Sequence, residues 1–122
     1  MKSEKPAILV VEDEVLVGMM AVQVAETAGF EALWAATADE AIRILESRSN
    51  VRLVFTDVNM PGSMDGLNLA HAVRHRWPPI ELLITSALSH ITARDLPERG
   101  RFLPKPYDVN ALSAVFKEMT AR

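Results

Sequence analysis

Short, continuous apolar runs alternate with longer segments of helical periodicity along this 122-residue chain. The apolar runs at residues 7–11, 53–56 and 80–85 are typical of strands that are buried on both faces. Two shorter runs, at residues 31–35 and 101–103, complete a series of five strand candidates. Alternating strands and helices favour parallel pairing with right-handed connections. The pattern therefore predicts an α/β fold with helices on both faces of a five-stranded parallel sheet.

The segments between the apolar runs carry helix start and stop signals. Residues 15–28 contain no proline and are followed by Gly29, a favourable residue just past a helix end. The Thr37-Ala-Asp-Glu40 sequence predicts a capping box that opens a helix to about residue 48. Two further helices are predicted, one at about residues 67–77 and one over residues 109–120.

The segment between the fourth and fifth strand candidates, residues 87–100, has no sustained helical stripe. Pro97 and Gly100 interrupt it, and its apolar residues do not recur at helical spacing. A helix in this segment is therefore predicted to be short or irregular.

Length, composition and charge limit the chain to one globular domain, residues 1–122. Apolar residues make up 49% of the chain and charged residues 24%, which is typical of a protein that buries a core. The chain has no cysteine, so it has no disulfide or thiolate metal site. Its first residues, 1–6, lack the apolar stretch of a secretion signal, and we expect the protein in the cytoplasm. The formal net charge of -3 and the lack of a membrane-length apolar run favour neither nucleic acid nor a membrane as partner.

Polar side chains follow four of the five strand candidates. They are Glu12, Asp13 and Glu14 after the first, Asp57 after the third, Thr85 and Ser86 at the end of the fourth, and Lys105 with Pro106 after the fifth. Because open parallel sheets bind ligands beyond the carboxyl ends of their strands, we expect these groups to lie close together.

The residue types at this edge suit phosphoryl chemistry. Neighbouring carboxylates resist ionising together unless a cation relieves their repulsion, and Mg²⁺ prefers such hard oxygen ligands. A lysine and a hydroxyl supply charge neutralisation and a hydrogen-bond donor to a phosphoryl group, and a carboxylate can act as the nucleophile. The sequence therefore predicts a magnesium-dependent phosphoryl site.

Five separated motifs give the pattern a specific resemblance. They are Val10-Val-Glu-Asp-Glu14, Asp57-Val-Asn-Met-Pro61, Met64-Asp-Gly66, Ser86-Ala87 and Lys105-Pro106, each near a strand end and in this order. With these motifs the chain resembles the receiver domains of bacterial response regulators from end to end. The resemblance implies the flavodoxin-like (CheY-like) fold, a three-layer α/β/α arrangement with strand order 2-1-3-4-5.

The resemblance also implies a role for each matched residue. Asp57 would be the phosphoacceptor. Mg²⁺ would be held by Glu12, Asp13, Asp57 and the backbone carbonyl of Asn59. Lys105 would contact the phosphoryl group beside a cis Lys105-Pro106 bond, and Ser86 with Phe102 would form the conformational switch. The phosphoryl donor would be a sensor histidine kinase or a phosphotransfer protein. The reaction would be autocatalytic, so we do not expect an enzyme that turns over other substrates.

The sequence departs from the family pattern at two places besides the segment of residues 87–100. The loop before Met64 carries one additional residue, at Gly62-Ser63. Pro104 replaces an apolar strand residue, and proline is tolerated in a sheet only at an edge. The fifth strand is an edge in the implied strand order, so Pro104 fits that order.

Two rival functions and two minor site hypotheses remain open. A small phosphatase with an aspartyl-phosphate intermediate would usually carry a second Asp where this chain has Asn59. A flavodoxin-like cofactor binder would need a phosphate-binding loop where this chain has acidic residues. His71 and His75 are spaced like a helical metal pair but have no apparent third ligand. Trp34 and Trp77 are interpreted as packing residues.

The first predicted helix is apolar on two faces. One face should pack on the sheet, and the opposite face carries Val15, Met19 and Val22. We expect these three residues to form a docking stripe for a kinase helical bundle or a weak homodimer, although exposed apolar residues without a partner are the alternative. The chain ends two residues after its last helix candidate, so we expect a stand-alone receiver rather than a fragment of a longer regulator or hybrid kinase.

Overall fold

Five parallel strands form one sheet in the computed structural model, which describes residues 5–62, 64–87 and 91–121. The strands are β1 (Ala7–Val11), β2 (Glu31–Ala35), β3 (Val51–Asp57), β4 (Glu81–Ser86) and β5 (Gly100–Pro104). Their spatial order is β2-β1-β3-β4-β5, which confirms the predicted topology. The order changes direction between β1 and β3, and open parallel sheets bind ligands beyond the carboxyl ends of the strands at such a point.

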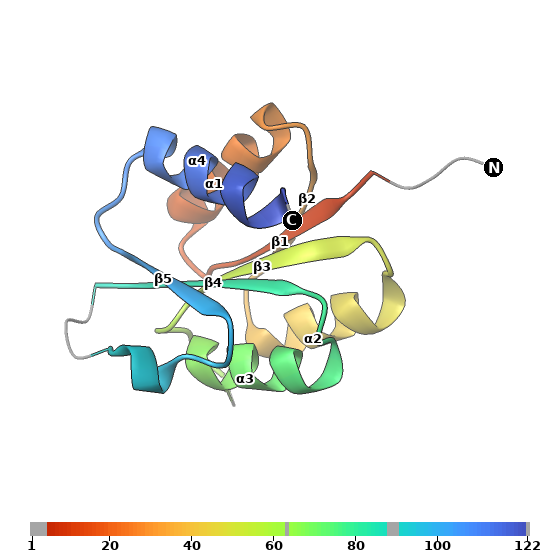
Figure 1. Ribbon diagram of the computed structural model, residues 1–122, viewed down its shortest axis with the longest axis vertical. Helices are drawn as coiled ribbons and strands as arrows, with labels where there is room; N and C mark the ends of the chain where they lie inside the picture. The colour runs from red at the N-terminus through yellow and green to blue at the C-terminus, as the bar shows by residue number, and fades with distance from the viewer. Residues whose placement is uncertain (1–4, 63, 88–90, 122) are drawn as a thin grey trace.

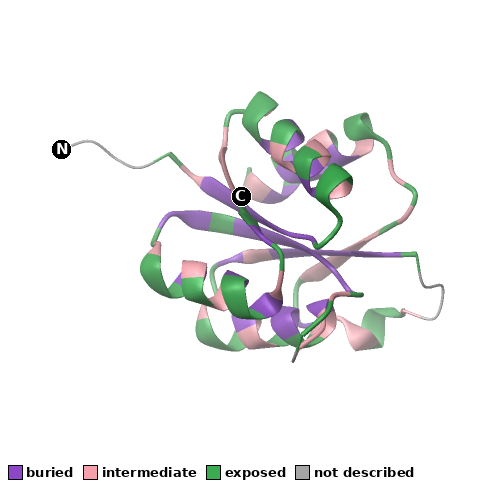
Figure 2. Cartoon of the chain, turned by 180° about the vertical axis from the view of Figure 1, so that it is seen from behind, coloured by how far each residue is buried: buried purple, intermediate pink, exposed green. Residues whose placement is uncertain are grey.

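Helices cover both faces of the sheet (Figure 1). Helices α1 (Val15–Thr27) and α4 (Val109–Thr120) lie on one face, and α2 (Ala38–Ser47) and α3 (Gly66–Arg76) lie on the other. Figure 2 shows that the central strands are almost wholly buried between these two layers. This burial explains why the strand sequences are continuous apolar runs rather than alternating ones. Within the part of the chain that the structure describes, no helix is both long and apolar enough to cross a membrane.

Side-chain caps begin three of the helices. Thr37 accepts a hydrogen bond from the Glu40 backbone N–H at 3.2 Å, and Glu40 accepts one from the Ala36 N–H at 2.7 Å. The predicted capping box is thus present, with the return contact one residue earlier than in the standard motif. Asp65 and Asp108 cap α3 and α4 in the same way. These caps satisfy backbone donors that the first helical turn leaves free.

The connection from β4 to β5 is irregular, as predicted. Its described part, residues 91–99, holds a single 3₁₀ turn, η1 (Ala93–Asp95); residues 88–90 lie outside the described residues, as does Ser63 of the longer loop. The His71 ring nitrogen Nε2 lies 2.9 Å from the Asp95 carbonyl oxygen, and Arg74 donates to the Glu98 carbonyl at 2.7 Å. Two side chains of α3 therefore hold this connection against that helix. Pro104 lies on the edge strand β5, where its missing N–H is tolerated.

Gly66 allows α3 to begin directly beside the end of β3. Its N–H donates to the Val58 carbonyl at 2.9 Å, and a Cβ at this position would overlap the Asp57 backbone carbonyl. The overlap is with main-chain atoms, which cannot rotate away as a side chain can. Gly66 therefore sets how closely α3 approaches the strand that ends in Asp57.

Replacing Gly66 with alanine should destabilise the protein by about 3 kcal/mol, because α3 must move away from β3 to admit the methyl group. Gly29→Ala is the matched control, since Gly29 has space around it but a φ of +99°. It should cost about 1 kcal/mol, from backbone strain alone. Urea denaturation measures both values. Equal losses in the two variants would show that the approach of α3 to β3 is not tight.

Candidate functional site

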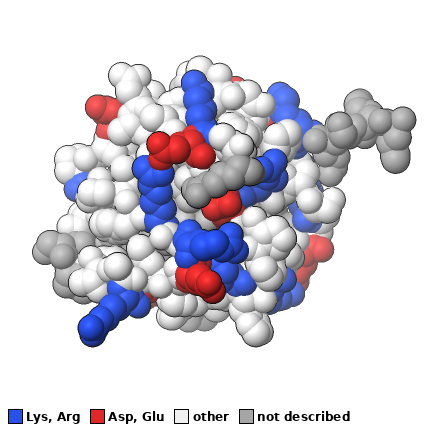
Figure 3. Space-filling model, viewed as in Figure 1, with Lys and Arg blue, Asp and Glu red and all other residues white. Residues whose placement is uncertain are grey.

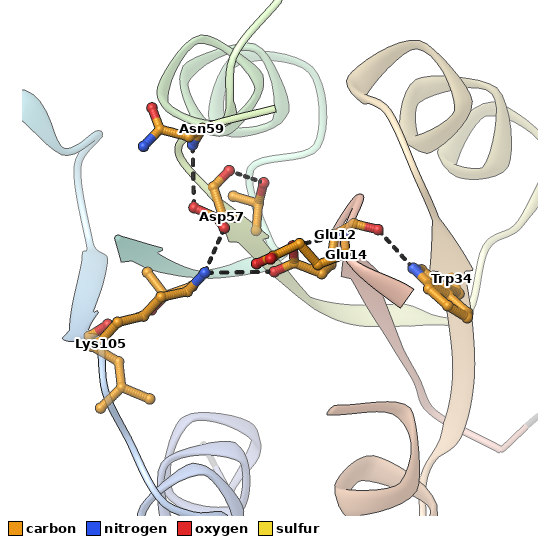
Figure 4. A network of polar contacts seen from close by, with 9 residues as sticks. Glu12, Glu14, Trp34, Asp57, Asn59 and Lys105 are labelled. Carbon is orange, nitrogen blue, oxygen red and sulfur yellow. Dashed lines mark hydrogen bonds and ion pairs between the residues drawn. The ribbon is translucent and has the colours of Figure 1, made fainter. Parts of the chain in front are cut away.

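Three charged side chains from three strand ends converge at the carboxyl edge of the sheet (Figure 4). Glu12 follows β1, Asp57 ends β3, and Lys105 follows β5. Figure 4 shows the Lys105 ammonium pointing between the two carboxylates. The predicted cluster thus forms from residues up to 93 positions apart, because parallel strands bring their carboxyl ends to one edge.

Both carboxylate oxygens of Asp57 have a hydrogen-bond donor. Lys105 Nζ donates to Oδ2 at 2.6 Å, and the Asn59 backbone N–H donates to Oδ1 at 3.1 Å. Asp57 is only 6% exposed, so these contacts compensate for a charge that has lost most of its water. The two contacts also fix the orientation of the carboxylate.

Glu12 is buried beside this pair. Its Oε2 accepts the Glu14 backbone N–H at 3.1 Å, and its Oε1 lies 3.9 Å from Lys105 Nζ. Burial raises the pKa of Glu12 from 4.5 to about 7, and the negative charge of Asp57 adds to the rise. The Glu14 N–H and the Lys105 charge oppose the rise without cancelling it. Near neutral pH, Glu12 therefore exchanges readily between its neutral and charged forms.

Lys105 remains a strong cation in this environment. Burial by itself lowers the pKa of Lys105, but the hydrogen bond and charge of Asp57, with the charges of Glu12 and Glu14, outweigh burial and raise it. Burial likewise raises the pKa of Tyr107 to about 12, with help from Glu12 and Asp57. The site therefore holds a permanent positive charge between two carboxylates, and the Lys105-Pro106 bond beside it is cis.

The donor set suits a hard divalent cation that shares its shell with water. Glu12 and Asp57 contribute carboxylate oxygens at the same spot, and Asp13, next to Glu12, is exposed to solvent. Within the described ranges, no three His, Asp or Glu side chains are gathered closely enough to hold a metal without other ligands. Mg²⁺ usually keeps several waters and takes only one or two carboxylates, so Glu12 and Asp57 would be sufficient carboxylate ligands for it.

The residues that the resemblance assigns to the switch lie on β4 and β5. Ser86 is buried at the end of β4, and its carbonyl accepts the Lys105 N–H at 3.1 Å. The neighbouring Thr85 hydroxyl donates to the Leu103 carbonyl at 2.6 Å. Phe102 is half-buried and packs against the core cluster on the α2 and α3 side of the sheet. This backbone hydrogen bond therefore connects the end of β4 to the residue that carries the ammonium group.

The exposed stripe on α1 differs from the predicted one. Val15 and Met19 are exposed, at 60% and 55%. Val22 is half-buried and packs against the core cluster beneath α1 and α4, because the helix turns that position toward α4 and the sheet. Leu16, which the sequence analysis did not single out, is 81% exposed. The exposed apolar patch therefore consists of Val15, Leu16 and Met19.

His71, Trp77 and Trp34 each make a contact within the fold. His71 reaches a backbone carbonyl of the β4–β5 connection, and the Arg76 guanidinium lies 4.4 Å from the centre of the Trp77 ring. Trp34 is more than a packing residue, because its indole N–H donates to the Glu12 carbonyl at 2.9 Å. Sequence periodicity carries no signal for such a contact between a strand side chain and a distant loop.

The raised pKa of Glu12 predicts a pH-dependent stability in metal-free protein. Between pH 4.5 and 7 the folded state keeps a proton that the unfolded state releases, so the free energy of unfolding falls as the pH rises. The loss reaches at most about 3 kcal/mol. Urea denaturation with a chelator at pH 5 and pH 8 measures it. Glu12→Gln should lose less stability over this interval than the wild type, and equal losses in the two proteins would refute the shift.

Comparisons with known proteins agree with this geometry. The family model for the response regulator receiver domain matches residues 8–117. The sensor kinase CckA of Brucella abortus (strain 2308) is 36% identical over 121 residues, which cover 96% of this chain and 13% of the kinase. This chain also spans 24% and 51% of the lengths of two other curated relatives.

Two solved structures extend the likeness to three dimensions. The receiver domain of NtrX from Brucella abortus is 31% identical, with a TM-score of 0.83 over 93% of this chain and 98% of that one. A putative response regulator from Chloroflexus aurantiacus J-10-fl is 28% identical, with a TM-score of 0.84 over 98% and 100%. Since the family match spans nearly the whole chain and the fold agrees, this chain belongs to the response regulator receiver domain family of two-component signalling.

Proposed function

We propose that this receiver accepts a phosphoryl group on Asp57 and signals through the conformational change that follows. The observation that carries the proposal is the Lys105 ammonium, 2.6 Å from Asp57 Oδ2 and 3.9 Å from Glu12 Oε1. It places a nucleophilic carboxylate, a fixed cation and a second acid at one strand edge. We further propose that residues 1–122 form one domain and that its reaction is confined to its own phosphorylation and dephosphorylation.

The reaction is a displacement at phosphorus. An Asp57 oxygen forms the new O–P bond while the N–P bond of a phosphohistidine breaks, and the bonding electron pair leaves with the imidazole. Glu12, Asp13, Asp57 and the Asn59 carbonyl would hold Mg²⁺, which supplies positive charge toward the phosphoryl oxygens. Lys105 neutralises further charge on the transferred group, so it exchanges its Asp57 contact for a phosphoryl contact.

The switch follows from the loss of that contact. Lys105 lies in the chain directly after β5, and its N–H is bonded to the Ser86 carbonyl. A phosphoryl group at Asp57 would draw both the ammonium and the Ser86 hydroxyl toward it. Movement of these groups would then shift β4 against β5, where Phe102 is half-buried.

The donor is proposed to be a sensor histidine kinase or a phosphotransfer protein. Receiver domains are phosphorylated by histidine kinases, and one relative of this chain is part of a sensor kinase. We propose that the exposed patch of Val15, Leu16 and Met19 takes part in docking this donor, because the patch lies at the start of α1, directly after the acidic residues of the site.

Phosphorylation of Asp57 should require Mg²⁺. Acetyl phosphate with Mg²⁺ should add one phosphoryl group to the intact mass of the wild type, and a chelator should prevent it because the repulsion between anions is then uncompensated. Asp57→Asn should not be modified. The matched change Asp39→Asn, at an exposed residue of α2, should leave modification unchanged. Wild-type levels of modification in Asp57→Asn would assign the phosphoacceptor elsewhere.

The docking role of the α1 patch can be separated from the chemistry. Leu16→Gln with Met19→Gln removes apolar area without adding charge, so the modification by acetyl phosphate should stay at the wild-type rate. Transfer from an autophosphorylated kinase that phosphorylates the wild type should slow about a hundredfold, since two buried apolar side chains at about 1.5 kcal/mol each contribute about 3 kcal/mol. Arg43→Gln on α2, on the other face of the sheet, is the control. Unchanged transfer by the double variant would exclude the patch from docking.

A further inference from the structure

Trp34, on the neighbouring strand β2, is hydrogen-bonded to the acidic loop of residues 12–14. Its indole Nε1–H donates to the Glu12 carbonyl at 2.9 Å, as Figure 4 shows. The Glu12 N–H donates to the Ala35 carbonyl at 3.0 Å. Both backbone groups of Glu12 are therefore bonded to two successive residues at the end of β2.

The indole replaces a backbone donor that the sheet no longer supplies. The pairing of β1 with β2 ends at Val11 and Ala35, after which the chain leaves β2 toward α2. The Glu12 carbonyl lies one residue beyond the ladder, so it needs a donor from elsewhere. The Trp34 side chain reaches past the end of the ladder and provides it.

Gly18 lets the same ring support the other side of the loop. Gly18 is buried in the first turn of α1, and a Cβ there would overlap the indole ring of Trp34. Since α1 begins at Val15, directly after the loop, the ring contacts the chain on both sides of residues 13 and 14. Trp34 is nevertheless 38% exposed on an edge strand, so packing alone does not account for its position.

We propose that Trp34 is a positioning residue that holds Glu12 and Asp13 in place for the divalent cation. The inference rests on the proposed function, because it assigns the cation to these two acids. A hydrogen bond to a ligand-bearing segment restricts its motion before the cation arrives, which improves affinity without contact between the indole and the metal. The indole also responds to the cation, because charge at Glu12 polarises the carbonyl to which it donates.

Trp34→Phe tests this assignment, since it keeps an aromatic side chain at the end of β2 and removes the indole N–H donor. The dissociation constant for Mg²⁺, measured by calorimetry, should rise about tenfold. In the acetyl phosphate reaction, the Mg²⁺ concentration for half-maximal rate should rise by the same factor, while the rate at saturating Mg²⁺ stays unchanged. Trp77→Phe is the matched control, because it removes the other tryptophan far from the strand end, and it should leave both quantities unchanged.

Fluorescence gives a second readout that does not depend on the folding of Trp34→Phe. In the Trp77→Phe variant Trp34 is the only tryptophan, so excitation at wavelengths that Tyr107 does not absorb reports on Trp34 alone. This emission should change on Mg²⁺ titration with the dissociation constant that calorimetry gives. The inference about Trp34 is overturned if the emission stays constant up to Mg²⁺ saturation, or if the Mg²⁺ affinity of Trp34→Phe is within twofold of wild type. Either result leaves the proposed function standing. A wild type that neither binds Mg²⁺ nor becomes phosphorylated overturns the proposed function and the inference with it.

Discussion

The ion pair between Lys105 and Asp57 is the interaction on which the site depends, because it balances a buried negative charge at the centre of the sheet edge. Asp57 lies at the end of the central strand β3, with little exposure to water. A lone carboxylate at this place would be costly to bury. Lys105 compensates for it from the edge strand, and the same ammonium lies within 3.9 Å of Glu12. The shared ammonium therefore keeps two acids close together, and a bound cation or phosphoryl group would change the contacts of all three side chains.

The surrounding structure holds each member of this cluster by its backbone. The Asn59 N–H orients Asp57, the Ser86 carbonyl holds the Lys105 N–H, and β2 holds Glu12 through Ala35 and Trp34. Side chains for which a chemical role is proposed are thus positioned by hydrogen bonds to backbone groups and to the Trp34 indole. Hydrogen bonds of this kind keep the side chains of a site within a narrow range of positions and orientations.

One face of the molecule is mixed in charge rather than uniformly acidic. Figure 3 shows lysine and arginine side chains interspersed with aspartate and glutamate on the face that it displays. Pairs such as Arg76 with Glu46 and Arg48 with Glu31 lie near the surface, where ion pairs contribute little to stability.

The alternation of strands and helices and the irregular β4–β5 connection could be predicted from sequence, because apolar periodicity, capping residues and proline act locally. The spatial strand order, and with it the edge position of Pro104, was predicted from the resemblance to receiver domains and not from these local patterns. The same patterns placed Glu12, Asp57 and Lys105 at strand ends, but not the distances between them. Only the tertiary structure decided that the ammonium lies between both acids, that Gly66 meets the Asp57 carbonyl and that Val22 turns inward. It also decided that the Trp34 indole completes the hydrogen bonding of Glu12. These contacts join residues far apart in the chain, and their geometry depends on how the helices pack on the twisted sheet.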